Sequence, residues 1–252
     1  MNIGIIYCGY NNIQYTQESI KVFIEARKNN LIKQICAVSL PFLEYHDINT
    51  EEDETPNFLS NLYKLNQIDN IFTNPRFIKE HLARDLCLQY LKIMHVDLIW
   101  LVDADEFYKY EDIVNIINYI NKNEAIWYKL NFKNYIFDGK QWIDGFCPPR
   151  IFRAKQQGYT IKEFYWDNDI AYEDQNQKQI SHNHLFNLEI PKNIAHIKHL
   201  TWLHENGKNK YEYQMKHFGH CGYKWNYKLN ELEFNQEYYL KNNEKTPIIN
   251  YE

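Results

Sequence analysis

The sequence has few cysteines, and none of them is spaced as in a disulfide framework or a metal-binding motif. It has five cysteines in 252 residues and no Cys-x-x-Cys pair. Because an odd number of thiols cannot all pair, this usage is typical of a reducing compartment. The sequence also lacks a basic leader and any run of about 18 apolar residues, so it predicts neither a signal peptide nor a membrane-spanning helix. These absences together predict a cytoplasmic protein.

An excess of positive charge is absent as well. The formal net charge is −5, and such a chain has no global attraction to polyanions. A nucleic-acid partner would need a local basic patch, for which the segment from Lys208 to Lys216 is a candidate. A solvated helix face explains that segment equally well. A nucleic-acid partner is therefore possible but not favoured.

Aromatic side chains, in contrast, are abundant. The chain has 21 tyrosines, 14 phenylalanines and 6 tryptophans. Tyrosine and tryptophan suit sugar and base pockets because each combines a flat apolar face with a polar tip. The hydrophobic fraction of 44% and the charged fraction of 24% are those of a soluble globular protein.

The stretch Leu98–Phe107 organises the rest of the chain. Five apolar residues predict a strand buried on both faces, and three carboxylates follow at its carboxyl end, where ligands bind in open α/β sheets. In an extended chain Asp103 and Asp105 project to the same side and can hold one hard divalent cation. The alternative is a loop whose acids are solvated.

The pattern along the chain predicts a mixed, mainly parallel sheet flanked by helices. Residues 1–135 form an α/β half, and residues 136–252 form an aromatic-rich, irregular second half of the same domain. Thr16 is the expected N-cap of the first helix. The expected buried face of a helix over 78–94 consists of Leu82, Leu86, Tyr90, Leu91 and Met94. The acidic run before Thr55 predicts an exposed loop without chemistry. The expected elements are strands over 2–7, 34–40, 70–73, 98–102, 125–132, 150–153 and 196–202, helices around 113–120 and 208–220, and a hairpin over 135–149.

Several motifs in this order resemble the GT-A fold glycosyltransferases of the family-2-like group, whose sheet is Rossmann-like. Arg84 precedes Asp-Ala-Asp-Glu-Phe by nineteen positions, and Arg150-Ile151-Phe152-Arg153 is similar to the Arg-Leu-Phe-Arg strand of that group. Residues 197–202 followed by Lys210-Tyr211 are similar to its late histidine element. Two departures stand out: Asp85 replaces the usual asparagine, and Ser39-Leu40-Pro41 stands where many members carry Asp-Gly-Ser. The second departure puts the usual base-recognition contact in doubt.

The resemblance implies a nucleotide-diphosphate sugar donor, with a UDP-sugar favoured, a Mn²⁺ or Mg²⁺ ion, and transfer to an acceptor hydroxyl, with inversion favoured. The reaction itself also requires a divalent cation, because the cation offsets the negative charge that grows on the leaving phosphate. The acceptor is a saccharide by default, although a hydroxymethylated DNA base or a protein side chain also presents a hydroxyl.

Site residues follow from the motifs. Asp105 is the expected direct metal ligand, Asp103 contacts the metal or the ribose, and His199 is the third ligand, in competition with His182, His184, His196 and His204. Arg84 binds a phosphate or positions the acid pair, unless it is only a surface cation. The remaining donor-binding residues are Tyr10, Asn12 and Arg150.

The general base of an inverting transfer is Asp144 or Asp174, unless either carboxylate is merely solvated. Glu106 holds the loop. Two other functions stay open: a non-catalytic nucleotide- or glycan-binding module, and a nucleotidyltransferase. The latter usually opens with a Gly-rich basic loop, which Gly9-Tyr10-Asn11-Asn12 is not.

Overall fold

A computed structural model describes residues 1–41, 53–74, 76, 78–166, 169–203, 208, 211–212, 215–216, 222–229, 231–242 and 248–251. It divides into two compact units. The first comprises residues 1–131 and 147–196, and the second comprises residues 132–146 and 197–252. The helix expected over 208–220 falls mostly outside the described residues. Among the described helices, none is long and apolar enough to cross a membrane.

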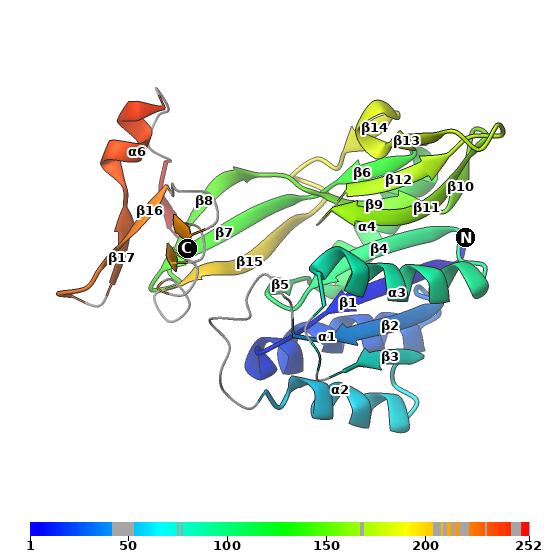
Figure 1. Cartoon of the computed structure of the whole chain (residues 1–252), viewed down its shortest axis with the longest axis horizontal. Coiled ribbons are helices and arrows are strands. Elements are labelled where there is room, and N and C mark those ends of the chain that lie inside the picture. Colours follow the sequence, from blue (N-terminus) through cyan, green and yellow to red (C-terminus); the bar gives the residue numbers. More distant parts are fainter. Residues whose placement is uncertain are drawn as a thin grey trace. The chain divides into compact units, whose positions relative to one another are not determined.

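The first unit is built on a mixed, mainly parallel sheet, which confirms the predicted fold class (Figure 1). Strands β3, β2, β1 and β4 run parallel, and only β9 is antiparallel to its neighbours β4 and β6. In sheet order the strands are β14 (Asn187–Glu189), β6 (Trp127–Lys129), β9 (Pro149–Arg153), β4 (Leu98–Asp103), β1 (Ile3–Cys8), β2 (Gln34–Ser39) and β3 (Asn70–Thr73).

Helices cover both faces of this sheet because its central strands are apolar on both sides. The side chains of Ile6, Ile99 and Leu101 pack with the buried side of α3 (Glu80–Ile93). On the other face, the Phe23 ring of α1 (Ile13–Lys28) meets the Trp100 ring edge-on, with 6.0 Å between the ring centroids. The remaining helices of this unit are α2 (Thr55–Lys64) and α4 (Tyr110–Lys122).

Two helix predictions need correction. Helix α1 begins at Ile13 with Asn12 as its N-cap, so Thr16 is a buried residue inside the helix and not the cap. Helix α3 buries Leu91, as expected, together with Leu88 and its small side chains. Leu82, Leu86 and Met94, expected on the same face, are exposed. Close packing on the sheet explains this choice, since a Cβ at Gly4 on β1 would come within 2.8 Å of Leu91 Cδ2.

A second, four-stranded sheet packs against α3 in the same unit. It is formed by the 163–187 region, whose structure the sequence left open, together with the residues just before it. Its strands are β10 (Lys155–Gln156), β11 (Tyr159–Trp166), β12 (Asp169–Glu173) and β13 (Gln179–Ser181), followed by a 3₁₀ turn at His182–His184.

The second unit is a small β structure with its own apolar core. The predicted hairpin is present as β7 (Asn131–Phe137) and β8 (Gln141–Phe146), and the predicted strand 196–202 is present as β15 (His196–Leu203). Strand β18 (Asn250–Tyr251) lies beside β8. The other elements are the hairpin strands β16 (Tyr223–Asn226) and β17 (Glu231–Phe234) and the short helix α6 (Gln236–Lys241).

Candidate active site at the carboxyl edge of the sheet

Asp103, the last residue of β4, is held between two buried arginine side chains. Arg84 Nη2 on α3 donates to Oδ1 over 2.9 Å, and Arg150 Nη2 on β9 donates to Oδ2 over 3.0 Å. Both arginine side chains are only 3% exposed. Because each carboxylate oxygen has its own charged donor, the orientation of Asp103 is fixed.

The ion pairs continue on both sides of Asp103. Arg84 also pairs with Glu80 one helical turn earlier, and Arg150 Nε donates to Glu106 Oε1 over 2.7 Å. Glu106 is fully buried, and its second oxygen accepts the Tyr108 hydroxyl at 2.9 Å. Burial raises the pKa of Glu106 to about 8, against the opposing effect of Arg150. Glu106 therefore anchors Arg150, in agreement with its expected role of holding the loop.

In this arrangement both arginines bond to the Asp103 carboxylate. The sequence left open whether Arg84 binds a phosphate or positions the acid pair, and the structure places it against Asp103. Arg150, expected among the donor-binding residues, is likewise engaged by Asp103 and Glu106. Burial opposes the charge of Arg150, but the two carboxylates raise its pKa on balance.

Asp105 lies just beyond the end of β4, in the turn before β5 (Glu106–Phe107). The expectation that Asp103 and Asp105 share one side of an extended strand is therefore wrong. The turn is fixed because the Ala104 amide donates to the Cys8 carbonyl over 2.8 Å and the Ala104 carbonyl accepts the Ser19 hydroxyl over 2.9 Å. The Asp105 carboxylate is half-buried, and its charge contributes to the raised pKa of Glu106 after the larger effect of burial.

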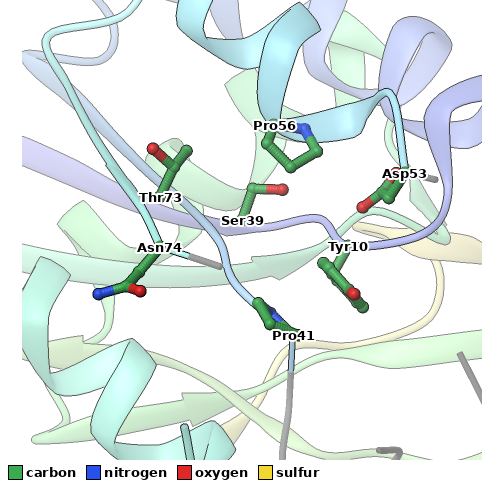
Figure 2. A pocket seen from close by; sticks show the side chains of 7 residues that line it. All are labelled: Tyr10, Ser39, Pro41, Asp53, Pro56, Thr73 and Asn74. Carbon is green, nitrogen blue, oxygen red and sulfur yellow. The ribbon is translucent and has the colours of Figure 1, made fainter. Parts of the chain in front are cut away.

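A pocket of about 370 Å³ opens at the same edge of the sheet, beyond the carboxyl ends of β1, β2 and β3. In Figure 2, Ser39 at the end of β2 lies between Pro56 and Pro41, with its hydroxyl directed toward the side of Tyr10 and Asp53. The described lining consists of Tyr10, Ser39, Pro41, Asp53, Pro56, Thr73 and Asn74.

Asp53 is a site residue that the sequence reasoning missed. Its carboxylate accepts the backbone amides of Asn11 and Thr55, and so it ties the turn after β1 to the start of α2. The acidic run is exposed at Glu54, as expected, but Asp53 is half-buried; that the run has no chemistry stays a prediction. The sequence contains a signal for this contact. Asp53 comes just before Thr55-Pro56, a typical helix start, where an aspartate side chain often accepts backbone amides.

The two residues expected to border the nucleotide have different positions. Tyr10 lines the pocket, whereas Asn12 caps α1 and its amide donates to the Thr55 hydroxyl over 3.1 Å. Asn12 thus shapes the loop beside the pocket, and its direct contact with a donor stays a prediction.

Asp174 is not brought together with these acids. Its Oδ1 accepts the amides of Asn176 and Lys178 in the β12–β13 turn. The neighbouring Tyr172 donates its hydroxyl to the Arg153 carbonyl, and Arg153 pairs with Leu98 at the other end of β4 from Asp103. Asp174 therefore has a structural role in this turn.

His199 and Asp144 belong to the second unit. His199 is buried against Phe132, and its Nδ1 lies 2.7 Å from Asn134 Oδ1. Asp144 lies on β8 and is exposed. Their roles as metal ligand and general base stay predictions. Among the competing histidines, His182 is buried against Trp127, and His204 lies outside the described residues.

Carboxylates at this edge of the sheet are possible ligands for a divalent cation. Within the part of the chain that the structure describes, no three His, Cys, Asp or Glu side chains gather in a way that holds a metal ion. Magnesium, however, is usually bound by one or two carboxylates that substrate phosphates and water complete. Asp105 lies at this edge and is a candidate for such a carboxylate, and both oxygens of Asp103 accept bonds from arginine. The residues present thus fit a cation shared with a ligand and not a closed protein cage.

Comparisons with known proteins add little to this description. No family model matches the chain, and no curated protein matches it. Solved structures that it resembles include S. aureus TarS 1–349 in complex with UDP-GlcNAc, with 15% identity, 53% of this chain and 35% of that chain covered, and a TM-score of 0.39. Another is the structure of GalNAc-T7 with UDP, GalNAc and Mn²⁺. Its sequence identity is 13%, the match covers 77% of this chain and 30% of that chain, and the TM-score is 0.40. Both are glycosyltransferases of the GT-A type.

The chain thus spans about a third of the length of these solved structures. At these identities and TM-scores the likeness assigns neither a function nor a site residue to this chain.

Proposed function

We propose that this protein is a glycosyltransferase that moves a sugar from a nucleoside-diphosphate donor to an acceptor hydroxyl, with a divalent cation at the carboxyl edge of its sheet. One observation carries the proposal. Asp103, held by Arg84 and Arg150, and Asp105 lie at the same edge as the 370 Å³ pocket. Binding of a donor across the ends of several parallel strands is the usual use of such an edge.

Charge balance supports the cation. Four carboxyl groups lie around the ends of β4 and β9, and the two guanidinium groups there, those of Arg84 and Arg150, are paired with carboxylates. The four belong to Glu80, Asp103, Asp105 and Glu106. A diphosphate would add further negative charge. A divalent ion on Asp105 would offset that charge and act as a Lewis acid on the leaving phosphate. The ion is Mg²⁺ or Mn²⁺, and a UDP-sugar is the favoured donor.

The side chains of the chain itself have separate tasks in this reaction. Arg84 and Arg150 fix the Asp103 carboxylate toward the cation or the ribose, and Glu106 fixes Arg150. In the transfer, the acceptor oxygen bonds to the anomeric carbon, the bond from that carbon to the phosphate oxygen breaks, and the acceptor proton passes to a base. Asp144 is the proposed base, and His199 is a proposed further ligand. Inversion at the anomeric carbon, a cytoplasmic location and a saccharide acceptor complete the proposal.

Release of nucleoside diphosphate from a panel of sugar nucleotides, with and without Mn²⁺ or Mg²⁺, tests this function. We expect release by the wild type that needs the cation, and a loss of at least about 100-fold in Asp105→Asn, because a carboxylate ligand becomes neutral. The matched control is Asp138→Asn in the exposed turn between β7 and β8, where an asparagine keeps the acceptor for the Lys140 amide.

Three outcomes would contradict the proposal. Nucleotide binding without turnover on any donor would favour a binding module. Pyrophosphate release from a nucleoside triphosphate and a sugar phosphate would favour a nucleotidyltransferase. Equal activity of Asp105→Asn and Asp138→Asn would remove Asp105 from the reaction.

A further inference from the structure

Helix α3 differs from α1 and α4 in the side chains that it presents to solvent. The exposed positions of α1 and α4 carry polar or charged residues, as is usual for helices that cover a sheet. The exposed positions of α3 are Leu82, Leu86, Gln89 and Ile93, and three of these side chains are large and aliphatic. We call these four residues the α3 stripe.

The α3 stripe leaves much apolar surface in contact with water. Leu82 is 46% exposed, Leu86 is 38% exposed and Ile93 is 73% exposed. Together they expose on the order of 300 Å² of apolar surface, and patches of this size often mark an interaction site. Helix α3 lies across one face of the main sheet, and Arg84 is on its buried side (Figure 1). A partner that covers the stripe therefore leaves the contact between Arg84 and Asp103 intact.

The spacing of the stripe indicates what kind of partner covers it. Its positions follow one another at intervals of four, three and four residues, which is the spacing of the apolar seam between two paired helices. At a rise of about 1.5 Å per residue, the seam is roughly 16 Å long. The α3 stripe thus fits a second helix of similar length.

Gln89, the polar member of the stripe, does not prevent its burial. Its Nε2 donates to Asp85 Oδ1 and to the Lys162 carbonyl, each over 3.2 Å. Because this amide nitrogen is hydrogen-bonded within its own chain, a covering helix does not have to supply an acceptor for it. A single polar residue in such a seam also favours one register of the two helices.

A second copy of this chain can supply the covering helix, because the stripe is complementary to itself. When two α3 helices pack antiparallel about a twofold axis, Leu82 lies opposite the partner's Ile93, and Leu86 lies opposite the partner's Gln89. The N-terminus of each helix then lies beside the C-terminus of the other, where the helix dipoles attract.

We infer that the α3 stripe is the contact surface of a homodimer in which the α3 helices of two copies pack antiparallel. Its apolar surface is smaller than the area of about 800 Å² per partner that a standard interface buries, so the dimer is weak and reversible. Neither the stripe nor its partner takes part in the proposed sugar transfer, and the dimer can be tested without any donor.

Sedimentation velocity of the full chain tests the dimer. We expect mainly monomer at about 1 μM and mainly dimer at about 200 μM. Leu86→Glu should raise the dissociation constant at least about 30-fold, because the twofold axis buries two like charges in the seam. The matched control is Asn118→Glu, which adds the same charge at an exposed position of α4 and should leave the dissociation constant unchanged.

Oxidation of cysteine variants tests the antiparallel arrangement. A mixture of Leu86→Cys and Gln89→Cys should form more disulfide-linked dimer than either variant alone, because the antiparallel register places these two positions opposite each other. The wild type gives the background from the native cysteines. Equal cross-linking of the mixture and of the single variants would contradict the antiparallel packing.

Thermal unfolding at about 1 μM separates an interface from a structural role of the stripe. Under these conditions the chain is monomeric, and Leu86→Glu should melt within about 2 °C of the wild type, as exposed substitutions usually do. A much lower melting temperature would show that another part of the same chain covers Leu86, and it would overturn the inference.

Two further results would overturn it. The first is a dimer that is equally strong in Leu86→Glu, which would place the contact on another surface. The second is a wild type that stays monomeric at 200 μM. If this monomer binds vesicles of phosphatidylcholine and phosphatidylglycerol and Ile93→Glu abolishes the binding, the stripe is a membrane contact instead.

Discussion

Arg150 is the side chain whose removal should destabilise this edge of the sheet most. It lies between two carboxylates, with Glu106 at 2.7 Å and Asp103 at 3.0 Å, and its side chain is 3% exposed. In Arg150→Met the thioether fills much of the volume, but Glu106 keeps only the Tyr108 hydroxyl as partner. Removing one partner of a buried ion pair destabilises a protein by about 3–5 kcal/mol, and we expect a loss of that size.

Arg153 on the same strand provides a matched control. Its guanidinium group donates to neutral oxygens, the carbonyls of Ala125 and Ile120 and the hydroxyl of Tyr128. Because no carboxylate loses its counter-charge, Arg153→Met should lower the free energy of unfolding by only about 1–2 kcal/mol. Urea unfolding at equilibrium measures both values, provided that the dependence on urea concentration is the same in each variant.

A double variant tests the physical reason for this difference. If the loss in Arg150→Met comes from the buried Glu106 carboxyl group, which has lost its cation, then adding Glu106→Gln should recover about 1–3 kcal/mol, because glutamine needs no counter-charge at any pH and still accepts the Tyr108 hydroxyl. A loss in Arg150→Met no larger than in Arg153→Met, or strictly additive effects of the two substitutions, would refute the reasoning.

Two further predictions concern the rest of the first unit. Burial lowers the pKa of His182, whose Nδ1 accepts a hydrogen bond from the Ile170 amide. Below about pH 6.5 the unfolded chain therefore binds a proton that the folded protein does not bind. As the pH falls further, the free energy of unfolding decreases by up to about 1.4 kcal/mol per pH unit. Measured between pH 7.5 and pH 5.5, the free energy of unfolding should decrease less in His182→Gln than in the wild type, and as much as in the wild type in the exposed control His184→Gln. An equal pH dependence in the two variants would contradict the prediction. Leu88→Ala should lower the free energy of unfolding by about 2–4 kcal/mol and Leu86→Ala by less than about 1 kcal/mol, because only Leu88 is buried. The reverse order would restore the helix face predicted from the sequence.

The sheet was predictable because its signal is local. Leu98–Val102 is continuously apolar, and in the structure every one of these residues is fully buried. The strand predicted over 70–73 has the same bounds in the structure. The buried face of α3 was not predictable in this way. Both of its sides carry apolar residues, and the sheet selects the side whose small residues, Ala83 and Cys87, allow close approach.

The pocket was harder to predict because its residues come from distant segments. Asp53 contacts Asn11 across 42 positions of the chain, and no periodicity in either segment signals this contact. The acidic run around Asp53 has the composition of a solvated loop, so charge alone does not predict that Asp53 is half-buried and bonded to two backbone amides. Ser39 was noticed only as a departure from a motif, and its burial without a partner is visible only in three dimensions.

The family resemblance gives the two aspartates of the strand-end motif different expected roles, but their spacing supplies no physical reason for the difference. Spacing alone treats Asp103 and Asp105 as an equivalent pair. In the structure the Asp103 carboxylate accepts hydrogen bonds from Arg84 and Arg150, which lie 19 and 47 positions away along the chain. Both of its oxygens thus face a guanidinium group. A cation at this edge would therefore compete with two arginines for Asp103, and this is why we assign to Asp103 the orientation of the donor.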